Sequence, residues 1–251
     1  MKISFEGKNV LITGGSRGIG AACVKIFAES GANTAFTYAR YEKAAMALLE
    51  SLSDFNVKAY RADFLYENEI IDCAKSVVAD FGDIDILVNN AGVRTYGEIE
   101  SMSLTTWEET IKINLTGSFL TTKFFVSSMK KKRYGKIIFV SSTAGQRVEA
   151  YHSHYAATKG AMISFAKSLA SELGEYNINV NCVAPGWVYT DMNNEVFNDK
   201  NFVEKIIDGI PLKRIAAADD VAAPILFLAS DYARHITGEV LNINGGSVLC
   251  G

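Results

Sequence analysis

Two side chains that can move a proton together lie four residues apart in the segment HYAATKGAMISFAKSLASEL, namely Tyr155 and Lys159. The segment has helical periodicity, and residues four apart share one helix face, about one turn from each other. A free phenol, with a pKa of about 10, is a poor acid or base at neutral pH, but a nearby ammonium favours the phenolate. The pair could therefore exchange a proton with an alcohol or carbonyl oxygen. The alternative is an ordinary solvated helix face.

The composition is that of a globular α/β protein. The chain has 251 residues, 49% of them hydrophobic and 21% charged, and no linker or low-complexity segment. We therefore predict a single domain over residues 1–251. The net charge of −3 favours neither nucleic acid nor an anionic membrane as a partner. The cysteines are too far apart in sequence to predict a metal site or a disulfide; they are Cys23, Cys73, Cys182 and Cys250.

The apolar segments of the chain bear on its location. The first residues, MKISFEGKNVLITGG, carry charges where a secretory signal needs an apolar region. The longest apolar run, near AAPILFLA, is too short to span a bilayer. Together with the cysteine pattern, these features predict a reduced, cytoplasmic location and no membrane partner.

Short runs rich in β-branched residues alternate with longer segments of helical periodicity. Strands are predicted at 8–13, 33–38, 56–60, 85–90, 135–142, 178–185 and 239–244. Helices are predicted near 18–30, 41–53, 67–81, 103–132, 155–175 and 219–230. This alternation predicts an α/β fold with a doubly wound parallel sheet, helices on both faces and right-handed crossovers. Ligands of such sheets bind beyond the carboxyl ends of the strands, where the winding reverses.

A glycine-rich turn, TGGSRGIG (13–20), joins the first predicted strand to the first predicted helix. Glycines let the backbone approach a pyrophosphate, and the helix N-terminus supplies N–H groups and a partial positive charge. In this position the turn predicts a dinucleotide site, the alternative being a plain tight turn. The predicted contacts are Gly14, Ser16, Arg17, Gly18, Ile19 and Gly20.

The end of the second predicted strand bears on the choice of nucleotide. An NAD site usually has an acidic residue there, bonded to the ribose 2′-hydroxyl, but this chain has Tyr38, Ala39 and Arg40. With no carboxylate to repel it, a 2′-phosphate could lie between Arg17 and Arg40, because guanidinium groups match phosphate geometry. We therefore predict NADP(H), the alternative being two solvated surface arginines.

Two further polar segments end at the same predicted edge of the sheet. Asp63 follows the third strand, and Asn90, Ala91 and Gly92 follow the fourth. Their position suits contacts with adenine and ribose. A lone Asp or Asn at such a point is more often a turn-former, so their assignment depends on the wider pattern.

That wider pattern resembles the short-chain dehydrogenase/reductase family over nearly the whole chain. The matching segments are TGGSRGIG (13–20), NNAG (89–92), Asn114 in INLTGSF, Ser142, YAATK (155–159), PGWVYT (185–190) and ITGEVLNINGG (236–246). They are similar, in order, to the family's cofactor loop, fourth-strand motif, catalytic tetrad, nicotinamide-covering segment and last strand.

The resemblance implies a place for each cofactor contact. Asp63 and Phe64 would flank the adenine, while Asn90 and Ala91 would contact the ribose. The segment over the nicotinamide would contribute Pro185, Gly186, Val188 and Thr190, the last two holding the carboxamide. The resemblance also implies a seven-stranded Rossmann-type sheet and a homotetramer, packed through the helices near 103–132 and 155–175 and the last strand. No metal site is predicted.

The resemblance further implies a proton relay that reduces a ketone. Ser142 would donate a hydrogen bond to the carbonyl oxygen, and Tyr155 would transfer the proton as general acid. Lys159 would lower the phenol pKa and hold the nicotinamide ribose, while Asn114 would hold a water that links Lys159 to solvent. Neighbouring Ser141 is not chosen, because successive strand residues point to opposite faces and the family spacing selects Ser142.

The histidines beside Tyr155 do not indicate a hydrolase. The chain has no G-x-S-x-G nucleophile elbow, and Ser142 follows a strand of a dinucleotide fold. We expect His152 and His154 to be polar residues at the rim of the site.

Within the family, the chain is most similar to the 3-oxoacyl-acyl-carrier-protein reductases of fatty acid biosynthesis. This implies an acyl-thioester substrate, and carrier-protein docking through Arg133 in the basic run KKKR (130–133), expected beside the active-site mouth. A solvated helix end rich in cations is the alternative. Those reductases often have a second basic residue where this chain has Tyr176 beside Glu175, which weakens the docking prediction.

Two other functions stay open at this point. One is an NADP-dependent dehydrogenase of a small ketone, sugar or polyol, and the other is a non-catalytic NADP(H)-binding regulator. The complete tetrad disfavours the regulator, since a pure binder needs no proton relay. The segment 187–210, which includes the amphipathic NFVEKIIDGIPL, is predicted to be a substrate lid.

Overall fold

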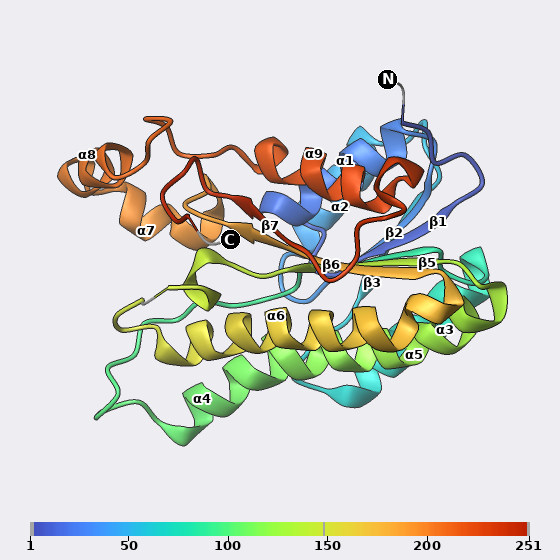
Figure 1. Ribbon diagram of the computed structural model, residues 1–251, viewed down its shortest axis with the longest axis horizontal. Helices are drawn as coiled ribbons and strands as arrows, with labels where there is room; N and C mark the ends of the chain where they lie inside the picture. The colour runs from blue at the N-terminus through green and yellow to red at the C-terminus, as the bar shows by residue number, and fades with distance from the viewer. Residues whose placement is uncertain (1–2, 148, 250–251) are drawn as a thin grey trace.

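The seven strands form one parallel sheet in the order β3-β2-β1-β4-β5-β6-β7 (Figure 1). This computed structural model describes residues 3–147 and 149–249, without the side chains of residues 194 and 195. The strands are β1 (Asn9–Ile12), β2 (Asn33–Tyr38), β3 (Val57–Arg61), β4 (Ile86–Asn89), β5 (Gly135–Val140), β6 (Ile178–Pro185) and β7 (Val240–Ile243). The predicted doubly wound sheet is confirmed, and its winding reverses between β1 and β4.

Helices cover both faces of the sheet (Figure 1). They are α1 (Gly18–Glu29), α2 (Glu42–Ser51), α3 (Glu67–Phe81), α4 (Leu104–Ile111), α5 (Gly117–Lys132), α6 (Ser153–Leu173), α7 (Asn194–Phe197), α8 (Lys200–Asp208) and α9 (Ala218–Ala229). One apolar core lies between the sheet and α1, α2 and α9, and a second lies between the sheet and α3, α5 and α6. The two cores explain why the central strands are apolar on both sides.

Burial along the strands follows their place in the sheet. Every residue of β5 and β6 is buried, as expected for parallel strands with both faces covered. The edge strands β3 and β7 are only partly buried. The longest helix, α6, buries Met162, Ala166, Ala170 and Leu173, whose spacing of three or four residues puts them on one face. This face fixes α6 against the second core.

The predicted helix at 103–132 is interrupted. Residues Leu104–Ile111 and Gly117–Lys132 are α-helical, and Lys112–Thr116 between them forms a π-helical turn that carries Asn114. A π-turn inserts one extra residue into a helix and often marks a functional site. The single helix predicted from periodicity is therefore wrong at this turn.

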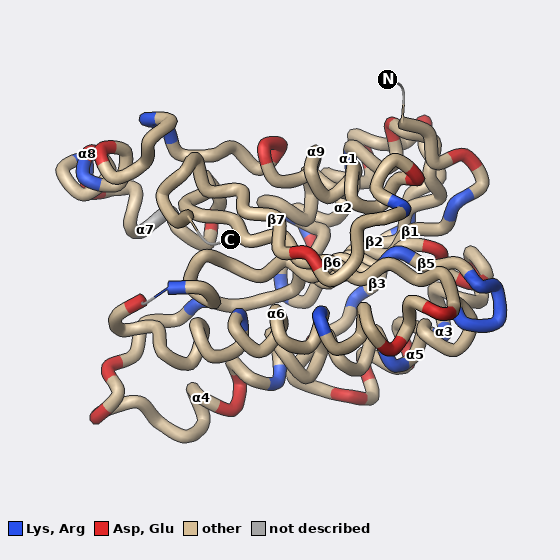
Figure 2. Tube along the Cα trace, in the orientation of Figure 1, with Lys and Arg blue, Asp and Glu red and all other residues tan. Residues whose placement is uncertain are grey.

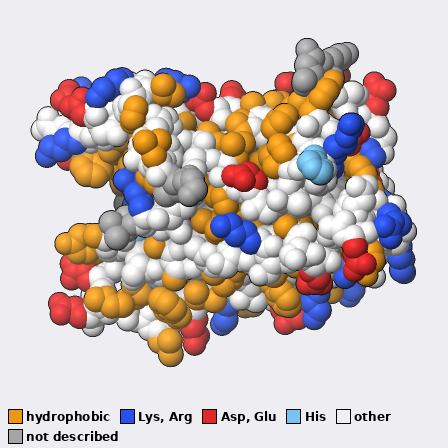
Figure 3. Space-filling view, viewed as in Figure 1, with side chains coloured by type: hydrophobic (Ala, Val, Ile, Leu, Met, Phe, Trp, Pro, Cys, Tyr) orange, Lys and Arg blue, Asp and Glu red, His pale blue; other side chains and the backbone are white. Residues whose placement is uncertain are grey.

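A smaller apolar cluster supports the segment after β6. Ile206 of α8 packs with Ile210 and Ile215, and Trp187 and Phe197 contact them. The predicted amphipathic helix in this segment is confirmed as α8. Figure 3 shows the surface indented between the projecting arm with α7 and α8 and the body beneath it. In the described residues we find no helix with the length and apolar character needed to cross a bilayer.

Candidate active site

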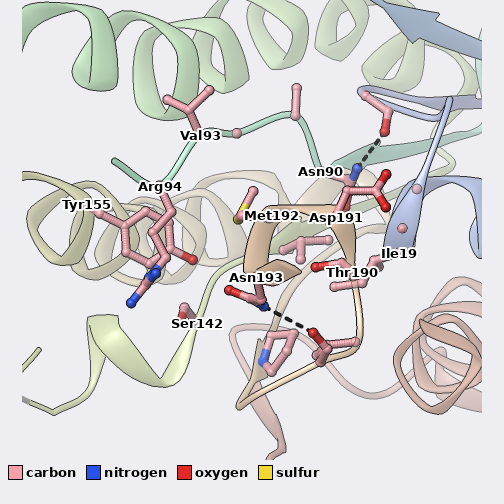
Figure 4. A pocket seen from close by; sticks show the side chains of 18 of the residues that line it. Ile19, Asn90, Val93, Arg94, Ser142, Tyr155, Thr190, Asp191, Met192 and Asn193 are labelled. Atoms are coloured by element: carbon pink, nitrogen blue, oxygen red, sulfur yellow. Dashed lines mark hydrogen bonds between the residues drawn. The ribbon is translucent and has the colours of Figure 1, made fainter. Parts of the chain in front are cut away.

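A cleft of about 800 Å³ opens at the carboxyl ends of the strands. Its volume is in the range of small-molecule and cofactor sites. All the residues predicted to bind cofactor or to act in catalysis line it, except Asn114. Figure 4 shows Tyr155, Ser142 and Arg94 toward one end of this pocket, and Asn90, Thr190 and Ile19 toward the other. The sequence-based site is thus brought together in one cavity.

The glycine-rich turn is shaped to leave a helix N-terminus open. Gly14 and Gly18 have φ values of +66° and +54°, a region that favours glycine. Arg17 is the N-cap of α1 but makes no side-chain cap hydrogen bond, and the first turn of α1 contains no acidic residue. Uncapped N–H groups at a helix N-terminus suit an anion such as a pyrophosphate. These residues therefore fit a dinucleotide.

Two threonines that the sequence analysis missed hold this turn in place. The Thr37 hydroxyl accepts a hydrogen bond of 3.0 Å from the Gly14 amide, and the Thr13 hydroxyl accepts 3.0 Å bonds from the amides of Asn90 and Ala91. Both threonines end neighbouring strands, so only strand pairing brings them to these amides. Thr13 opens the TGGSRGIG turn, but a local motif does not reveal its bonds to the end of β4 or the bond that Thr37 makes.

Asn90 is occupied by the turn itself. Its side-chain amide donates to the carbonyls of Thr13 and Gly14 at 2.9 and 3.0 Å. The side chain therefore ties the end of β4 to the turn after β1. The predicted contact of Asn90 with the ribose would therefore have to come from atoms other than its side-chain nitrogen, and it stays a prediction.

The two residues predicted to flank adenine differ in exposure, because Asp63 is partly exposed and Phe64 is not. Phe64 is buried and packs against the start of α5, where a Cβ on Gly117 would lie 2.4 Å from its ring. Asp63 accepts a 3.0 Å hydrogen bond from the Leu65 amide, so it also forms the turn that such a residue commonly makes. Both line the cleft.

The nucleotide end of the cleft is basic. The Arg17 guanidinium lies 3.8 Å above the Tyr41 ring and 3.4 Å from an Asp191 carboxylate oxygen. Arg40 is exposed and lines the same end, without an ion-pair partner among the described residues. The end of β2 therefore contributes no carboxylate to this end of the cleft, and the carboxylate that contacts Arg17 comes from the segment after β6.

The predicted proton relay is assembled on α6 and the end of β5. Tyr155 and Lys159 are 8% and 4% exposed, and the Lys159 Nζ lies 5.6 Å from the centre of the Tyr155 ring. The Ser142 hydroxyl is near the Tyr155 phenol and lowers its pKa. Lys159 also donates a 2.7 Å bond to the Val140 carbonyl, which fixes its long side chain. The geometry suits proton transfer at an oxygen near Ser142 and Tyr155.

On balance the pKa of Tyr155 is raised and not lowered in this structure, so the predicted effect of Lys159 on Tyr155 stays a prediction. Burial raises the pKa of Tyr155 to about 12, outweighing the opposing effect of Ser142. Burial also lowers the pKa of Lys159 to about 8. Burial disfavours the charged form of both groups, an effect that sequence spacing does not reveal. Tyr155 is therefore held as a protonated donor at neutral pH.

The two serines at the end of β5 face opposite sides, as predicted. Ser141 is buried and donates a 2.8 Å hydrogen bond to the Lys159 carbonyl, so its hydroxyl supports the backbone of α6. Both serines touch the cleft, but Ser142 is only partly buried, and its hydroxyl accepts a hydrogen bond from the Ala144 amide instead of supporting the backbone of α6. These positions support the choice of Ser142 over Ser141, and the catalytic role of Ser142 stays a prediction.

Asn114 is fully buried behind the relay. Its amide donates to the Val93 carbonyl at 3.0 Å and to the Thr158 hydroxyl at 3.1 Å, and its Oδ1 accepts from the Val93 amide at 2.8 Å. These bonds join the π-turn, the loop after β4 and α6. Asn114 thus positions the elements around Lys159, while its predicted contact with a water stays a prediction.

Known proteins share this arrangement. A family model described as Enoyl-(Acyl carrier protein) reductase matches residues 14–247. The 3-oxoacyl-[acyl-carrier-protein] reductase FabG of Aquifex aeolicus (strain VF5) is 40% identical over 248 residues, 98% of this chain and 99% of that protein. The protein of the same name from Escherichia coli (strain K12) is 38% identical over 247 residues, 98% of this chain and 100% of its own length. The chain belongs to the short-chain dehydrogenase/reductase family.

Solved structures of this family agree with the fold. The short-chain dehydrogenase/reductase "SDR:Glucose/ribitol dehydrogenase" from Brucella melitensis has a TM-score of 0.92 and 32% identity, with 100% of both chains covered. As a member of the short-chain dehydrogenase/reductase family, the protein is an oxidoreductase that acts on CH–OH and C=O groups and uses a nicotinamide cofactor.

The prediction that both histidines beside Tyr155 lie at the rim of the site is wrong for one of them. His154 is fully buried and does not line the cleft; its Nε2 is 2.8 Å from the Thr95 hydroxyl. It sits one residue before Tyr155 in α6, and this turns its ring away from the cleft. His152 does line the cleft, as predicted.

The basic run that contains Arg133 lies far from the cleft mouth. Arg133 ends α5 just before β5 begins, and its guanidinium donates a 2.6 Å bond to the Glu175 carbonyl. A crossover helix runs antiparallel to the strands it joins, so its C-terminus lies at the edge opposite the cleft. Figure 2 shows these cations gathered at the end of α5, at the far side of the molecule from α7 and α8. The predicted location beside the mouth is wrong for a single chain.

The substrate end of the cleft contains side chains that motif analysis missed. Arg94 follows β4 and forms an ion pair with Glu149 at 2.6 Å, while Trp187 follows β6. All three line the cleft. Trp187 lies in the PGWVYT segment, but Arg94 and Glu149 belong to no motif, and the three are too far apart in sequence to be grouped by spacing.

Proposed function

We propose that the protein is an NADPH-dependent reductase of a 3-oxoacyl thioester, similar to the 3-oxoacyl-acyl-carrier-protein reductases. The observation that carries the proposal is the placement of Ser142, Tyr155 and Lys159 at one end of a cleft whose other end is a glycine-rich, basic nucleotide site. The full-length relatives named for this activity support the choice of substrate.

Each residue of the proposed tetrad has a task that its surroundings support. Ser142 donates a hydrogen bond to the substrate carbonyl oxygen and polarises it. Tyr155, which its raised pKa keeps protonated, gives its proton to that oxygen. The nearby Lys159 ammonium stabilises the phenolate as it forms. Asn114 holds the loop after β4 against α6, and so keeps Lys159 in position.

The nicotinamide cofactor, when bound, supplies the hydride. Gly14, Gly18 and the open N-terminus of α1 would hold its pyrophosphate. We propose NADP(H) over NAD(H), because Arg40 faces the nucleotide end without an ion-pair partner among the described residues. Arg17 would contribute as well if its contact with Asp191 opened.

The segment over the cleft is proposed to be the substrate lid, at residues 187–210. Thr190 lies close to the cofactor turn, since a Cβ on Gly18 would be 3.1 Å from its methyl group. The lid thus spans both ends of the cleft, and its apolar side chains Trp187 and Phe202 line the substrate end.

A homotetramer is also part of the proposal. Leu104, Trp107 and Phe119 are exposed apolar side chains on α4 and α5, two helices that would pack between subunits. Carrier-protein docking at Arg133 would then serve the cleft of a neighbouring subunit, because Arg133 is remote from its own. Light scattering after gel filtration tests the assembly: a monomer would contradict it.

A spectrophotometric assay at 340 nm tests the activity. We expect oxidation of NADPH with acetoacetyl thioesters, and kcat/KM for NADPH at least about tenfold above that for NADH. Preference for NADH would overturn the cofactor assignment. The same assay with small ketones and sugars examines the alternative substrates, and tight NADPH binding without turnover of any of them would favour a regulator.

Carrier-protein docking has its own test. Arg133→Glu should raise KM for a substrate linked to acyl carrier protein but leave KM for the same acyl group on coenzyme A unchanged. Equal effects on both substrates would contradict docking at Arg133. Arg234→Glu, at another exposed surface position, serves as the charge control.

A further inference from the structure

We propose that Arg94 and Glu149 form a polar stop at the substrate end of the cleft, which limits the enzyme to short 3-oxoacyl groups. The inference rests on the proposed function and narrows its substrate class. Neither residue belongs to a motif of the cofactor site or of the proposed tetrad.

The pair is fixed and largely shielded from solvent. The Arg94 Nε and Nη2 donate to the same Glu149 oxygen, Oε1, at 2.8 and 2.6 Å. The two side chains are 14% and 24% exposed. Since both donors go to one oxygen, Arg94 keeps three further N–H groups, and the second Glu149 oxygen has no hydrogen bond from the described residues. The pair can therefore still bind polar groups.

Arg94 links the two walls of the cleft. On one side it holds Glu149, which follows β5; on the other its guanidinium lies 5.4 Å from the Trp187 ring, which follows β6. Trp187 is backed by Phe202 of α8, with ring centres 6.3 Å apart. Figure 4 shows Arg94 and Tyr155 projecting into the same part of the pocket. A group that extends from the reacting carbonyl on this side therefore meets the pair.

The pair is also close enough to act on Tyr155. The charge of Glu149 raises the pKa of Tyr155 and the charge of Arg94 lowers it. Tyr96 and Tyr151, stacked with ring centres 5.4 Å apart, line the cleft beside the pair. The space beyond the carbonyl is thus bounded by charges and aromatic rings.

An alkyl chain pressed against this pair would remove its remaining water without giving a hydrogen bond in return. That desolvation is unfavourable for charged groups. A 3-oxodecanoyl group extends further from the reacting carbonyl than an acetoacetyl group and so brings more apolar surface to the pair. The structure therefore favours short acyl groups.

The test compares the wild type with Arg94→Met/Glu149→Leu, which replaces both charges by apolar groups of similar size. Removing a buried pair together is tolerated better than removing one partner. We expect kcat/KM of the wild type for acetoacetyl-coenzyme A to be at least about tenfold above that for 3-oxodecanoyl-coenzyme A. In the double variant this short-to-long ratio should fall by about tenfold. Lys58→Met/Asp80→Leu, an ion pair that does not line the cleft, is the control and should keep the wild-type ratio.

Two further measurements keep the outcomes separate. Dissociation constants of both thioesters, measured by calorimetry with NADP⁺ present, show the chain-length ratio without turnover. The ratio of kcat/KM for butane-2,3-dione to that for decane-2,3-dione gives the same comparison of chain lengths without a thioester. A wild type that prefers the long chain, or a double variant with an unchanged ratio, overturns the polar stop. Dione reduction with the expected ratio but no thioester binding would overturn the proposed function alone.

Discussion

The two ends of the cleft are built in different ways. The nucleotide end is made mainly of backbone: the turn with Gly14 and Gly18 and the open first turn of α1. The substrate end is made of side chains, Arg94, Glu149 and Trp187, from loops that follow three different strands. The first depends on contiguous sequence and the second on the assembled sheet. This difference explains why one end carries a recognisable motif and the other does not.

Tyr155→Phe acts at the end of the cleft opposite the nucleotide turn and should give the largest effect. We expect kcat to fall at least 100-fold, the weight usual for acid–base catalysis. The NADPH dissociation constant should change less than about threefold, because the nucleotide end is built separately. Steady-state kinetics and fluorescence titration measure both. Near-normal turnover would contradict the assignment of Tyr155 as proton donor. A large loss of NADPH affinity would show that the two ends of the cleft are not independent.

Ser142→Ala and Ser141→Ala compare two adjacent hydroxyls. Loss of the Ser142 hydroxyl should lower kcat about 100-fold, as for other donors aimed at a reacting oxygen. Loss of the Ser141 hydroxyl removes its bond to the Lys159 carbonyl and should cost about 1 kcal/mol of stability, with kcat lowered much less. Kinetics and urea unfolding of the two variants check this. Equal losses of kcat would contradict the assigned directions.

Lys159→Met tests the energetic cost of the charged relay. Because the pKa of Lys159 is lowered from 10.5 to about 8, the unfolded chain binds more protons between these values, so wild-type stability should rise with pH across this window. Below pH 8 the cost of burial is complete. Allowing for the lost bond to the Val140 carbonyl, the variant should be about 2 kcal/mol more stable at pH 7, though inactive.

Urea unfolding at pH 7 and pH 10 measures this difference. The advantage of Lys159→Met should shrink at the higher pH, where the wild-type amine is neutral in the folded protein. A constant advantage at both pH values would show that packing, not charge burial, separates the two proteins.

Gly18→Ala should give the smallest effect, confined to the nucleotide end. A side chain at φ +54° costs about 1 kcal/mol, and its Cβ would press on Thr190. We expect NADPH to bind about tenfold more weakly while kcat at saturating NADPH is nearly unchanged. Gly174→Ala is the matched control, since a Cβ there meets no atom within 4 Å and φ is −59°. Equal effects of the two substitutions would contradict the prediction.

The sequence predicts the sheet well because hydrophobic periodicity reports burial directly. The strands at 33–38 and 178–185 and the helix at 67–81 have the predicted limits. The π-turn at Asn114 is not predicted, since one inserted residue barely changes the apolar pattern. The pKa values of Tyr155 and Lys159 are also not predicted, because both follow from how deeply α6 is buried.

The site residues divide along similar lines. The cofactor turn and the relay carry spacing that can be recognised in one segment. Arg94 and Glu149 are 55 positions apart and meet only in the folded chain. Arg133 shows the converse error: its charge suggested a role at the cleft, but the direction of α5 places it at the opposite edge of the sheet.

Gly145, just after β5, touches the backbone of α6 so closely that a Cβ would lie 2.6 Å from the Lys159 carbonyl carbon. Together with the Ser141 bond, this contact fixes the distance between the serine strand and the tyrosine helix. The groups that transfer the proton are therefore held by a close contact between two backbone segments, whereas the residues proposed to bind the substrate lie on loops outside this contact. Laboratory evolution of new substrate ranges can accordingly exchange the lid and the residues near Arg94 without realigning the groups that transfer the proton.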